Sequence, residues 1–401
     1  MTAQAMIFVP GAKGSKLVDT NRVDFDTIWS ALQSEFESIE SLELTDVDEG
    51  IQYDVAADAI IRSGELERLA YGEYLGDMHG DVPIYIFSYD WRMSSVTNGE
   101  RLDEFLSYLQ EKSAASARMK TIDSFNVVTH SLGAQVVRAY MNLYTDPLHR
   151  LNKILFTVPP FAGSLDVVTT ILCGEGFFGR TRTKIRRLVR GMPGAIELLP
   201  TYEGAARFDD GKRVDFFNSS HWQTNVVRSK PRLGKGQTDT AARFRSALEF
   251  SRKSVRDGLF DLSSLATAGR RRILVVARDG YKTVQSLAVV RKPEDQPVEN
   301  FVDLEHAVRS DNGDGRVPHV SSCRFAESVP TLLVRRSVFD RDYSHALFLK
   351  DERVQRLTRR FFGRGRFDYD GPGRSVRRVK RVVAVESSAG GPAGDWTVET
   401  D

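Results

Sequence analysis

The residue best placed for chemistry is Ser131, in the segment NVVTHSLGA at residues 126–134. Apolar residues before it predict a buried strand and those after it predict an amphipathic helix, so the serine lies on a strand-to-helix turn. There its hydroxyl points away from the sheet, and N–H groups of the helix amino terminus face a developing oxyanion. The G-x-S-x-G pattern is only partly met, because Thr129 replaces the first glycine while Gly133 keeps the second. A serine that merely caps a helix would look the same, so this segment alone favours neither interpretation.

An acid and a base follow later in the chain. Asp314 lies in the loop DNGDGRVP at residues 311–318, and His345 comes after a late strand. The glycines of the loop permit the turns that aim a carboxylate. In a Ser–acid–His site the histidine removes the serine proton, and the acid holds the imidazole tautomer and stabilises its cation. The loop is also compatible with a solvated turn, whereas an EF-hand calcium loop fails because Ser321 stands where the glutamate is required.

Other residues compete for both roles. The alternatives are Asp311 and Asp279 for the acid and His319 and His306 for the base. We prefer His345 to His319, because His319 is too close in sequence to Asp314 to come from a separate loop. His130 adjoins Ser131, but neighbouring side chains diverge on a sharp turn, and the base must approach the serine from another loop. We therefore expect His130 to pack or form a hydrogen bond beneath the turn.

A glycine-containing loop near the amino terminus could complete such a site. It reads VPGAKGSKL at residues 9–17. Gly11 and Gly14 let the backbone approach a bound group closely, so the N–H of Ala12 can pair with that of Leu132 as an oxyanion hole. The spacing matches neither a phosphate-binding P-loop nor G-x-G-x-x-G.

These residues must be positioned by a sheet whose strands end at a common edge. Short runs rich in β-branched residues alternate with helical segments, which is typical of a mostly parallel sheet covered on both faces. The predicted strands are Met6–Val9, Ile84–Phe87, Phe125–Val128, Ile154–Val158, Ile273–Ala277 and Thr331–Val334. The sequence therefore predicts an α/β fold with helices on both faces of the sheet.

The order of predicted strands and helices divides the chain into segments. Residues 1–160 form the first part of the core and include a small helical, acidic excursion at 19–75. Residues 161–270 are rich in basic residues, lack a convincing strand and form an inserted cap or lid, and residues 271–363 complete the core. Residues 364–401 become basic and then rich in Gly and Ser, so we expect a flexible tail with little apolar surface to offset the entropy of ordering.

The bulk composition excludes several classes of protein. The 401 residues carry a formal net charge of +2, which gives no reason to expect nucleic acid as a partner. Cys173 and Cys323 indicate neither a disulfide framework nor a thiolate metal site, and the expected chemistry needs no metal or organic cofactor. There is no signal peptide and no apolar run of about 20 residues, so we expect a cytoplasmic protein, with peripheral membrane attachment left open. The sequence does not indicate an oligomeric state.

Several motifs, taken in chain order, resemble the lecithin:cholesterol acyltransferase (LCAT) family. They are VPGAKGSKL at 9–17, YDWR at 89–92, THSLG at 129–133, GDGRVP at 313–318 and the late His345. The resemblance spans roughly residues 6–355 and implies an α/β-hydrolase fold with a cap, in a family of acyltransferases, phospholipases and lipases. It implies Ser131 as nucleophile, Asp314 as acid and His345 as base, with the amides of Ala12 and Leu132 as oxyanion donors.

The resemblance also implies a set of residues that support the pocket. They are Gly11, Gly14, Asp90, Trp91 and Arg92. Core packing alone would explain Trp91 equally well. Thr129 and Arg316 depart from the family pattern, in which many members have glycine and threonine. No cysteine occurs in residues 1–172, so the lid lacks the disulfide that members from oxidising compartments carry.

Apolar and basic residues adjoin each other at the start of the predicted cap. The candidates for lipid contact are Phe161, Phe177, Phe178, Arg186 and Arg187. An apolar patch beside a cationic one suits an anionic membrane surface. A cap helix that packs its apolar side on the core and leaves its arginines in water explains the pattern equally well.

Together these observations predict a serine-dependent hydrolase of lipid acyl esters that works through an acyl-enzyme. An O-acyltransferase would pass the acyl group to a lipid alcohol instead of water, and the sequence does not separate the two. A non-catalytic hydrolase-fold module that binds a partner or a membrane is a second alternative. The complete Ser–Asp–His set argues against that module.

Overall fold

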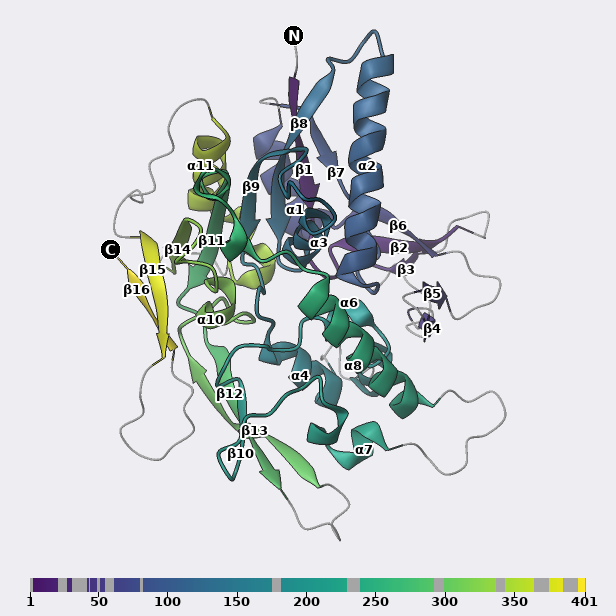
Figure 1. Cartoon of the computed structure of the whole chain (residues 1–401), viewed down its shortest axis with the longest axis vertical. Coiled ribbons are helices and arrows are strands. Elements are labelled where there is room, and N and C mark those ends of the chain that lie inside the picture. The colour runs from purple at the N-terminus through teal and green to yellow at the C-terminus, as the bar shows by residue number, and fades with distance from the viewer. Residues whose placement is uncertain are drawn as a thin grey trace.

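The computed structural model describes most of the chain. The described residues are 3–20, 27–30, 42, 44–48, 51–54, 61–79, 82–174, 182–228, 239–291, 299–336, 343–363, 375–384 and 396–400. The main sheet has eight strands in the order β16-β15-β14-β11-β9-β8-β1-β7 (Figure 1). Its strands are β1 (Ala3–Val9), β7 (Ile84–Ile86), β8 (Ile122–His130), β9 (Leu151–Thr157), β11 (Ile273–Asp279), β14 (Thr331–Arg335), β15 (Val376–Ala384) and β16 (Trp396–Thr400).

All neighbouring pairs from β7 to β14 are parallel, so the carboxyl ends of these strands meet at one edge of the sheet. Each strand predicted from the sequence is confirmed within this sheet. β11 is buried from Ile273 to Arg278, as expected for a central strand covered on both faces. The chain has an α/β-hydrolase fold.

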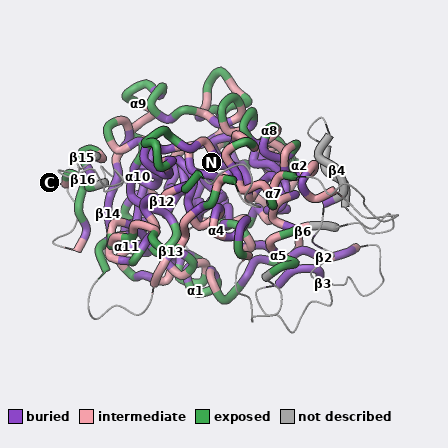
Figure 2. The backbone as a smooth tube through the Cα atoms, turned by 90° about the horizontal axis from the view of Figure 1, so that it is seen from below, coloured by how far each residue is buried: buried purple, intermediate pink, exposed green. Residues whose placement is uncertain are grey.

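Helices cover both faces of the sheet. On one face lie α2 (Ser95–Ala115) and α3 (Gly133–Met141), and on the other lie α1 (Arg68–Met78), the 3₁₀ helix η5 (His345–Lys350) and α11 (Glu352–Phe362). Leu106 of α2 packs in the same cluster as Ile7 of β1, while Tyr74 of α1 packs with Phe8, the next residue along that strand. In Figure 2 the buried residues gather in the interior between these layers.

A second cluster of apolar residues lies in the region of the predicted cap, beyond the carboxyl edge of the sheet (Figure 1). Its helices are α4 (Leu165–Cys173), α5 (Arg182–Val189), α6 (Pro193–Ile196), α7 (Thr224–Val227) and α8 (Thr240–Asp257), followed by α9 (Thr267–Arg270). The cap expectation is corrected in one respect, because this region contains the strand β10 (Ala206–Phe208). β10 pairs with β12 (Thr283–Arg291), and β12 pairs with β13 (Asn300–Ser310), both beyond residue 270.

In its described part, the excursion at residues 19–75 is mainly not helical, and this prediction is corrected there. Its described part holds short antiparallel strands, and α1 begins only at its end. The strands are β2 (Ser15–Asp19), β3 (Thr27–Trp29) and β6 (Ile61–Leu66) in one sheet and β4 (Leu44–Asp48) with β5 (Ile51–Asp54) in another. β2 leads into this segment, and its alternating burial is typical of a half-buried strand.

The prediction of a flexible tail at residues 364–401 is also wrong for its described part. β15 pairs antiparallel with β14, and β16 pairs with β15, so the tail extends the main sheet. Val376 and Val379 of β15 are 3% and 2% exposed. Valines between the basic residues supply the apolar surface that the tail was expected to lack.

Candidate active site

Ser131 lies on the turn between β8 and α3. Its backbone φ is 51°, in the left-handed region that residues other than glycine rarely adopt, which marks a strained turn. The N–H of Ser131 donates to the carbonyl oxygen of Thr157 at 3.0 Å, which ties the turn to the end of β9. Thr129 is fully buried and pairs with Val9, so its β-branched side chain completes β8 in place of the glycine.

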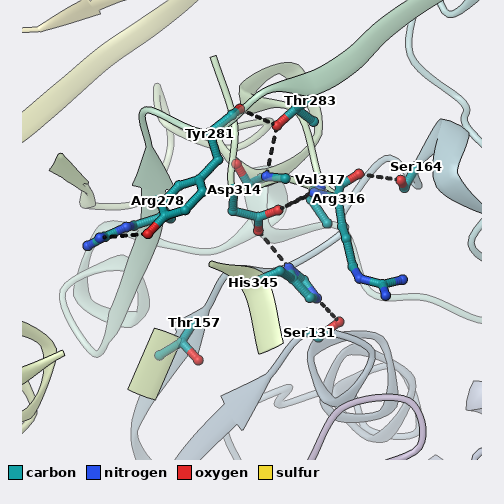
Figure 3. Close-up of polar contacts among 12 residues, drawn as sticks. Ser131, Thr157, Ser164, Arg278, Tyr281, Thr283, Asp314, Arg316, Val317 and His345 are labelled. Atoms are coloured by element: carbon teal, nitrogen blue, oxygen red, sulfur yellow. Dashed lines mark hydrogen bonds and ion pairs between the residues drawn. The ribbon is translucent and has the colours of Figure 1, made fainter. Parts of the chain in front are cut away.

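The side chains of Ser131, His345 and Asp314 lie in line in Figure 3. Nε2 of His345 is 2.7 Å from Oγ of Ser131, and Nδ1 of His345 is 2.6 Å from Oδ2 of Asp314. His345 begins η5 after β14, and Asp314 follows the hairpin of β12 and β13. Loops from separate parts of the chain thus bring together the three residues that the sequence nominated, at distances that suit proton transfer.

The carboxylate of Asp314 is buried and fully hydrogen-bonded. Its Oδ1 accepts the N–H groups of Arg316 at 2.9 Å and Val317 at 2.7 Å. Burial alone would raise the pKa of this carboxyl, but His345 and the two backbone donors together lower it. Gly315 has a φ of 96°, and its N–H donates to Oγ1 of Thr283 at 2.9 Å, which holds the loop in place (Figure 3).

The competing acids and bases lie away from the serine. Asp311 and His306 have side chains that are 63% and 79% exposed. His319 is buried, but its Nε2 lies 3.1 Å from a backbone carbonyl at the end of β11. Asp279, in the same region, is 3.5 Å from that His319 nitrogen. Within the described residues, none of these side chains has a hydrogen bond to Ser131.

His130 lies beneath the turn, as the sequence predicts. Its Nδ1 is 2.9 Å from the hydroxyl of Tyr71, and its Nε2 is 2.9 Å from the carbonyl oxygen of His345. Burial, with a smaller contribution from the charge of His345, lowers the pKa of His130 to about 3. His130 is therefore neutral near neutral pH. Its hydrogen bond goes to the backbone of His345, and the centroids of the two rings lie 5.3 Å apart.

The glycine loop after β1 approaches the serine turn closely. A Cβ at Gly11 would lie 2.8 Å from Nδ1 of His130, so only glycine allows this approach. Ala12 and Gly14 line the same pocket as Ser131. Within the described part of the chain, the N–H groups of Ala12 and Leu132 have no hydrogen-bond partner. Both are available to an oxyanion.

The segment of Asp90, Trp91 and Arg92 follows β7 and supports the pocket wall. Arg92 and Asp90 form a buried ion pair at 2.7 Å. Trp91 lines the pocket, and its ring packs edge-on against that of Trp29 with centroids 5.4 Å apart. The carbonyl of Arg92 accepts the N–H of Gly194 at 3.0 Å, which joins this segment to α6.

The pocket beside Ser131 and His345 has a volume of about 380 Å³ and is mainly apolar. The apolar side chains that line it include Trp29, Leu69, Ala70, Trp91, Val167, Val189, Met192, Leu198 and Leu347. They come from the core, from α1 and from the cap. The volume lies at the small end of the range for small-molecule sites, roughly 300 to 1,000 Å³.

The described residues among those expected to contact lipid do not line this pocket. Phe161 is 3% exposed and packs against Phe156 and Phe325, so it is a core residue and this expectation is corrected. Arg186 donates to a carbonyl of α4, whereas Arg187 is exposed. Phe177 and Phe178 lie outside the described residues. Contact of Arg187 with an anionic membrane stays a prediction.

Sequence reasoning missed two features of the site. The spacing of Tyr71 and Tyr74 indicates only the buried face of a helix, so the sequence did not predict a role for the Tyr71 hydroxyl. Ser164 donates to the carbonyl of Arg316 at 2.5 Å, and the guanidinium of Arg316 pairs with Asp166 at 2.7 Å. These contacts join the loop that carries Asp314 to the beginning of α4 (Figure 3). No local sequence motif predicts them.

Two further findings apply to the described residues only. No group of three or more His, Cys, Asp or Glu side chains there is placed to hold a metal ion. No helix in these ranges has the length and apolar character needed to cross a membrane.

Comparison with known proteins places the chain in a family. A chain in the crystal structure of the Tle4–Tli4 complex has the same fold, with a TM-score of 0.58 and 16% identity over 88% of this chain and 97% of that chain. The lin2722 gene product of Listeria innocua (TM-score 0.34, 12% identity, 92% and 100% covered) and phospholipase PlaB of Legionella pneumophila (TM-score 0.24, 12% identity, 90% and 64% covered) are more distant. No curated protein matches. The family model for lecithin:cholesterol acyltransferase matches residues 34–252, more than half of the length, and the chain therefore belongs to the LCAT family.

Proposed function

We propose that the protein is a serine-dependent hydrolase of lipid acyl esters. The observation that carries this proposal is the line of hydrogen bonds from Asp314 through His345 to Ser131 beside an apolar pocket. Membership of the LCAT family supports the broader activity, hydrolysis or transfer of lipid acyl esters. The apolar lining supports a substrate whose acyl chain enters the pocket next to the serine.

The proposed reaction passes through an acyl-enzyme. His345 takes the proton of Ser131 as Oγ attacks the ester carbonyl, and Asp314 stabilises the imidazolium that forms. The N–H groups of Ala12 and Leu132 bind the oxyanion of the tetrahedral intermediate. Its collapse expels the alcohol, which takes the proton from His345. Water, deprotonated by His345, then attacks the acyl-enzyme. As the fatty acid leaves, Oγ of Ser131 takes the proton back from His345 and the enzyme is regenerated.

Labelling with a fluorophosphonate tests this assignment, because the reagent modifies an activated serine. We expect the unmodified protein to be labelled and Ser131→Ala to lose the label while it remains folded by circular dichroism. Ser164→Ala is a matched control, since Ser164 also lines the pocket but its hydroxyl donates to the Arg316 carbonyl. Equal labelling of the unmodified protein and Ser131→Ala would leave the non-catalytic binding module as the better proposal.

The choice between hydrolysis and transfer requires analysis of the products. We would incubate the protein with phospholipid and a long-chain alcohol and identify the products by mass spectrometry. Free fatty acid without new ester supports hydrolysis. New ester as the main product would replace the proposal with an O-acyltransferase, because both reactions share the same acyl-enzyme.

A further inference from the structure

We propose that Tyr71 is a positioning residue that fixes the oxyanion side of the site, an inference that rests on the proposed function. Tyr71 lies on α1, is 2% exposed and lines the pocket. Within the described residues, no hydrogen bond joins it to Ser131. Instead its hydroxyl oxygen lies 3.1 Å from the N–H nitrogen of Gly11 and 2.9 Å from Nδ1 of His130. It therefore connects the glycine loop to the residue beside the nucleophile.

The direction of each hydrogen bond in this network follows from a single acceptor. The carbonyl oxygen of His345 can only accept, so Nε2 of His130, 2.9 Å away, carries the proton. Nδ1 of His130 is then unprotonated and accepts from the hydroxyl of Tyr71. The oxygen of Tyr71 in turn accepts the N–H of Gly11. Because its proton is committed to His130, Tyr71 positions the site and does not donate to the substrate.

Burial holds both side chains in these protonation states. It raises the pKa of Tyr71 above the usual value, so the hydroxyl stays protonated. Burial also lowers the pKa of His130 to about 3, so the ring stays neutral near neutral pH. The donor and acceptor pattern is therefore the same across the working range of a serine hydrolase.

The network clamps the peptide unit that precedes the oxyanion donor. Tyr89 donates its hydroxyl proton to the carbonyl of Pro10 at 2.8 Å, and Gly11 donates its N–H to Tyr71 at 3.1 Å. Both polar groups of the peptide between Pro10 and Gly11 are thus held by buried tyrosines. The next N–H belongs to Ala12, which the proposed mechanism assigns to the oxyanion. Fixing the preceding peptide fixes the direction of this donor before the substrate binds.

At its other end the network reaches the backbone of the proposed base. The N–H of His345 donates to the carbonyl of Asp314 at 3.0 Å, and its carbonyl accepts from Nε2 of His130. A continuous chain of hydrogen bonds therefore runs from the glycine loop through Tyr71 and His130 to His345. Removing the Tyr71 hydroxyl leaves the Gly11 N–H and Nδ1 of His130 without a partner and loosens both sides of the nucleophile.

Steady-state kinetics of Tyr71→Phe on a p-nitrophenyl ester test the inference. We expect kcat to fall about tenfold, the effect of about one hydrogen bond in the transition state. KM should stay within about twofold, because the lost interaction acts on the oxyanion and not on the bound ester. A purely structural role would not produce this separation of kcat from KM.

Tyr74→Phe is the matched control. Tyr74 lies on the same helix, is fully buried, packs against Phe8 as Tyr71 does, and donates its hydroxyl to Thr358, away from the site. Both variants lose a buried hydroxyl, so similar losses in unfolding free energy are expected, but only Tyr71→Phe should lose kcat. Equal kcat values in the two variants would overturn the inference. An unmodified protein that neither reacts with fluorophosphonate nor hydrolyses any ester would instead overturn the proposed function, and the inference with it.

Discussion

Hydrogen bonds hold both carboxylate oxygens of Asp314. It accepts two backbone N–H groups on one oxygen and Nδ1 of His345 on the other. A carboxylate held in this way stays ionised and fixes the proton of His345 on Nδ1, which leaves Nε2 free to accept from Ser131. An asparagine at this position would have only one side-chain oxygen, so its NH₂ group would face one of these three donors and could not accept from it. The rotamer and tautomer of the base therefore depend on the negative charge at this position.

Asp314→Asn should lower kcat on the order of 10⁴-fold with little change in circular dichroism, because the wrong histidine tautomer then faces Ser131. Ester hydrolysis monitored spectrophotometrically measures the effect. Asp311→Asn is the control, since Asp311 is in the same loop but is 63% exposed and pairs with Lys282 at 3.4 Å. Its exposed pair contributes little, so kcat should stay near that of the unmodified protein. A larger loss in Asp311→Asn than in Asp314→Asn would reassign the acid.

At this scale the sequence predicted the residues that carry a local signal and missed those that depend on distant contacts. Ser131 and His345 could be nominated because each follows a recognisable strand in the expected order. Tyr71 could not, because its partners Gly11 and His130 lie 60 and 59 residues away in the sequence. A tyrosine on a buried helix face has the same appearance whether or not its hydroxyl is used.

Among the elements, β15 is the one whose role changed most from the prediction. β14 would otherwise form the outer edge of the parallel sheet, with unpaired backbone groups. β15 pairs with it and adds Val379, which is 2% exposed and packs with Ala277 and Leu333. Antiparallel addition of β15 thus covers the edge of the parallel sheet at β14.

Val379→Ala should lower the free energy of unfolding by about 2 kcal/mol, because it removes two buried methyl groups from a packed strand. Urea denaturation followed by tryptophan fluorescence measures this change. Arg377→Ala, at an exposed position of the same strand, should change the free energy by less than about 0.5 kcal/mol. If both substitutions are neutral, the tail contributes nothing to the core and the flexible-tail expectation stands.

The elements that were predicted correctly share a simple physical origin. The central parallel strands are continuous apolar runs because both of their faces are covered, and such runs are visible in sequence. β15 has two basic residues between successive valines, first Arg377 and Arg378 and then Lys380 and Arg381, so the sequence lacks the alternation typical of a strand. β3 to β6 are short strands in the segment that was predicted to be helical and acidic, and strands of this length leave little periodic pattern in the sequence.

For the molecule as a whole, the burial of His130 makes the free energy of unfolding depend on pH. Burial lowers the pKa of His130 to about 3 from an ordinary value of 6.5, with the charge of the facing His345 adding to the effect and Asp314 opposing it. Between these two values the unfolded chain binds a proton that the folded protein does not. Stability is therefore full above about pH 6.5 and is lost as the pH falls toward 3. Burial alone would raise the pKa of Asp314 and Asp351, but hydrogen bonds and nearby cations lower both, so their contribution has the same sign.

The loss attributable to His130 between about pH 7 and about pH 4.5 is about 3 kcal/mol, from the two pKa values and the linkage relation. His130→Gln cannot take up this proton, so its unfolding free energy should fall by that much less over the same interval, whatever its value at pH 7. Urea unfolding at both pH values measures the difference for each protein. His306→Gln serves as the control, because His306 is 79% exposed and its pKa is raised, chiefly by the hydrogen bond to Asp303, so its removal should not reduce the acid loss. An unchanged pH dependence in His130→Gln would mean that folded His130 also takes up this proton by about pH 4.5. At that pH its Nδ1 would then donate to the hydroxyl oxygen of Tyr71, while the N–H of Gly11 would still donate to the same oxygen.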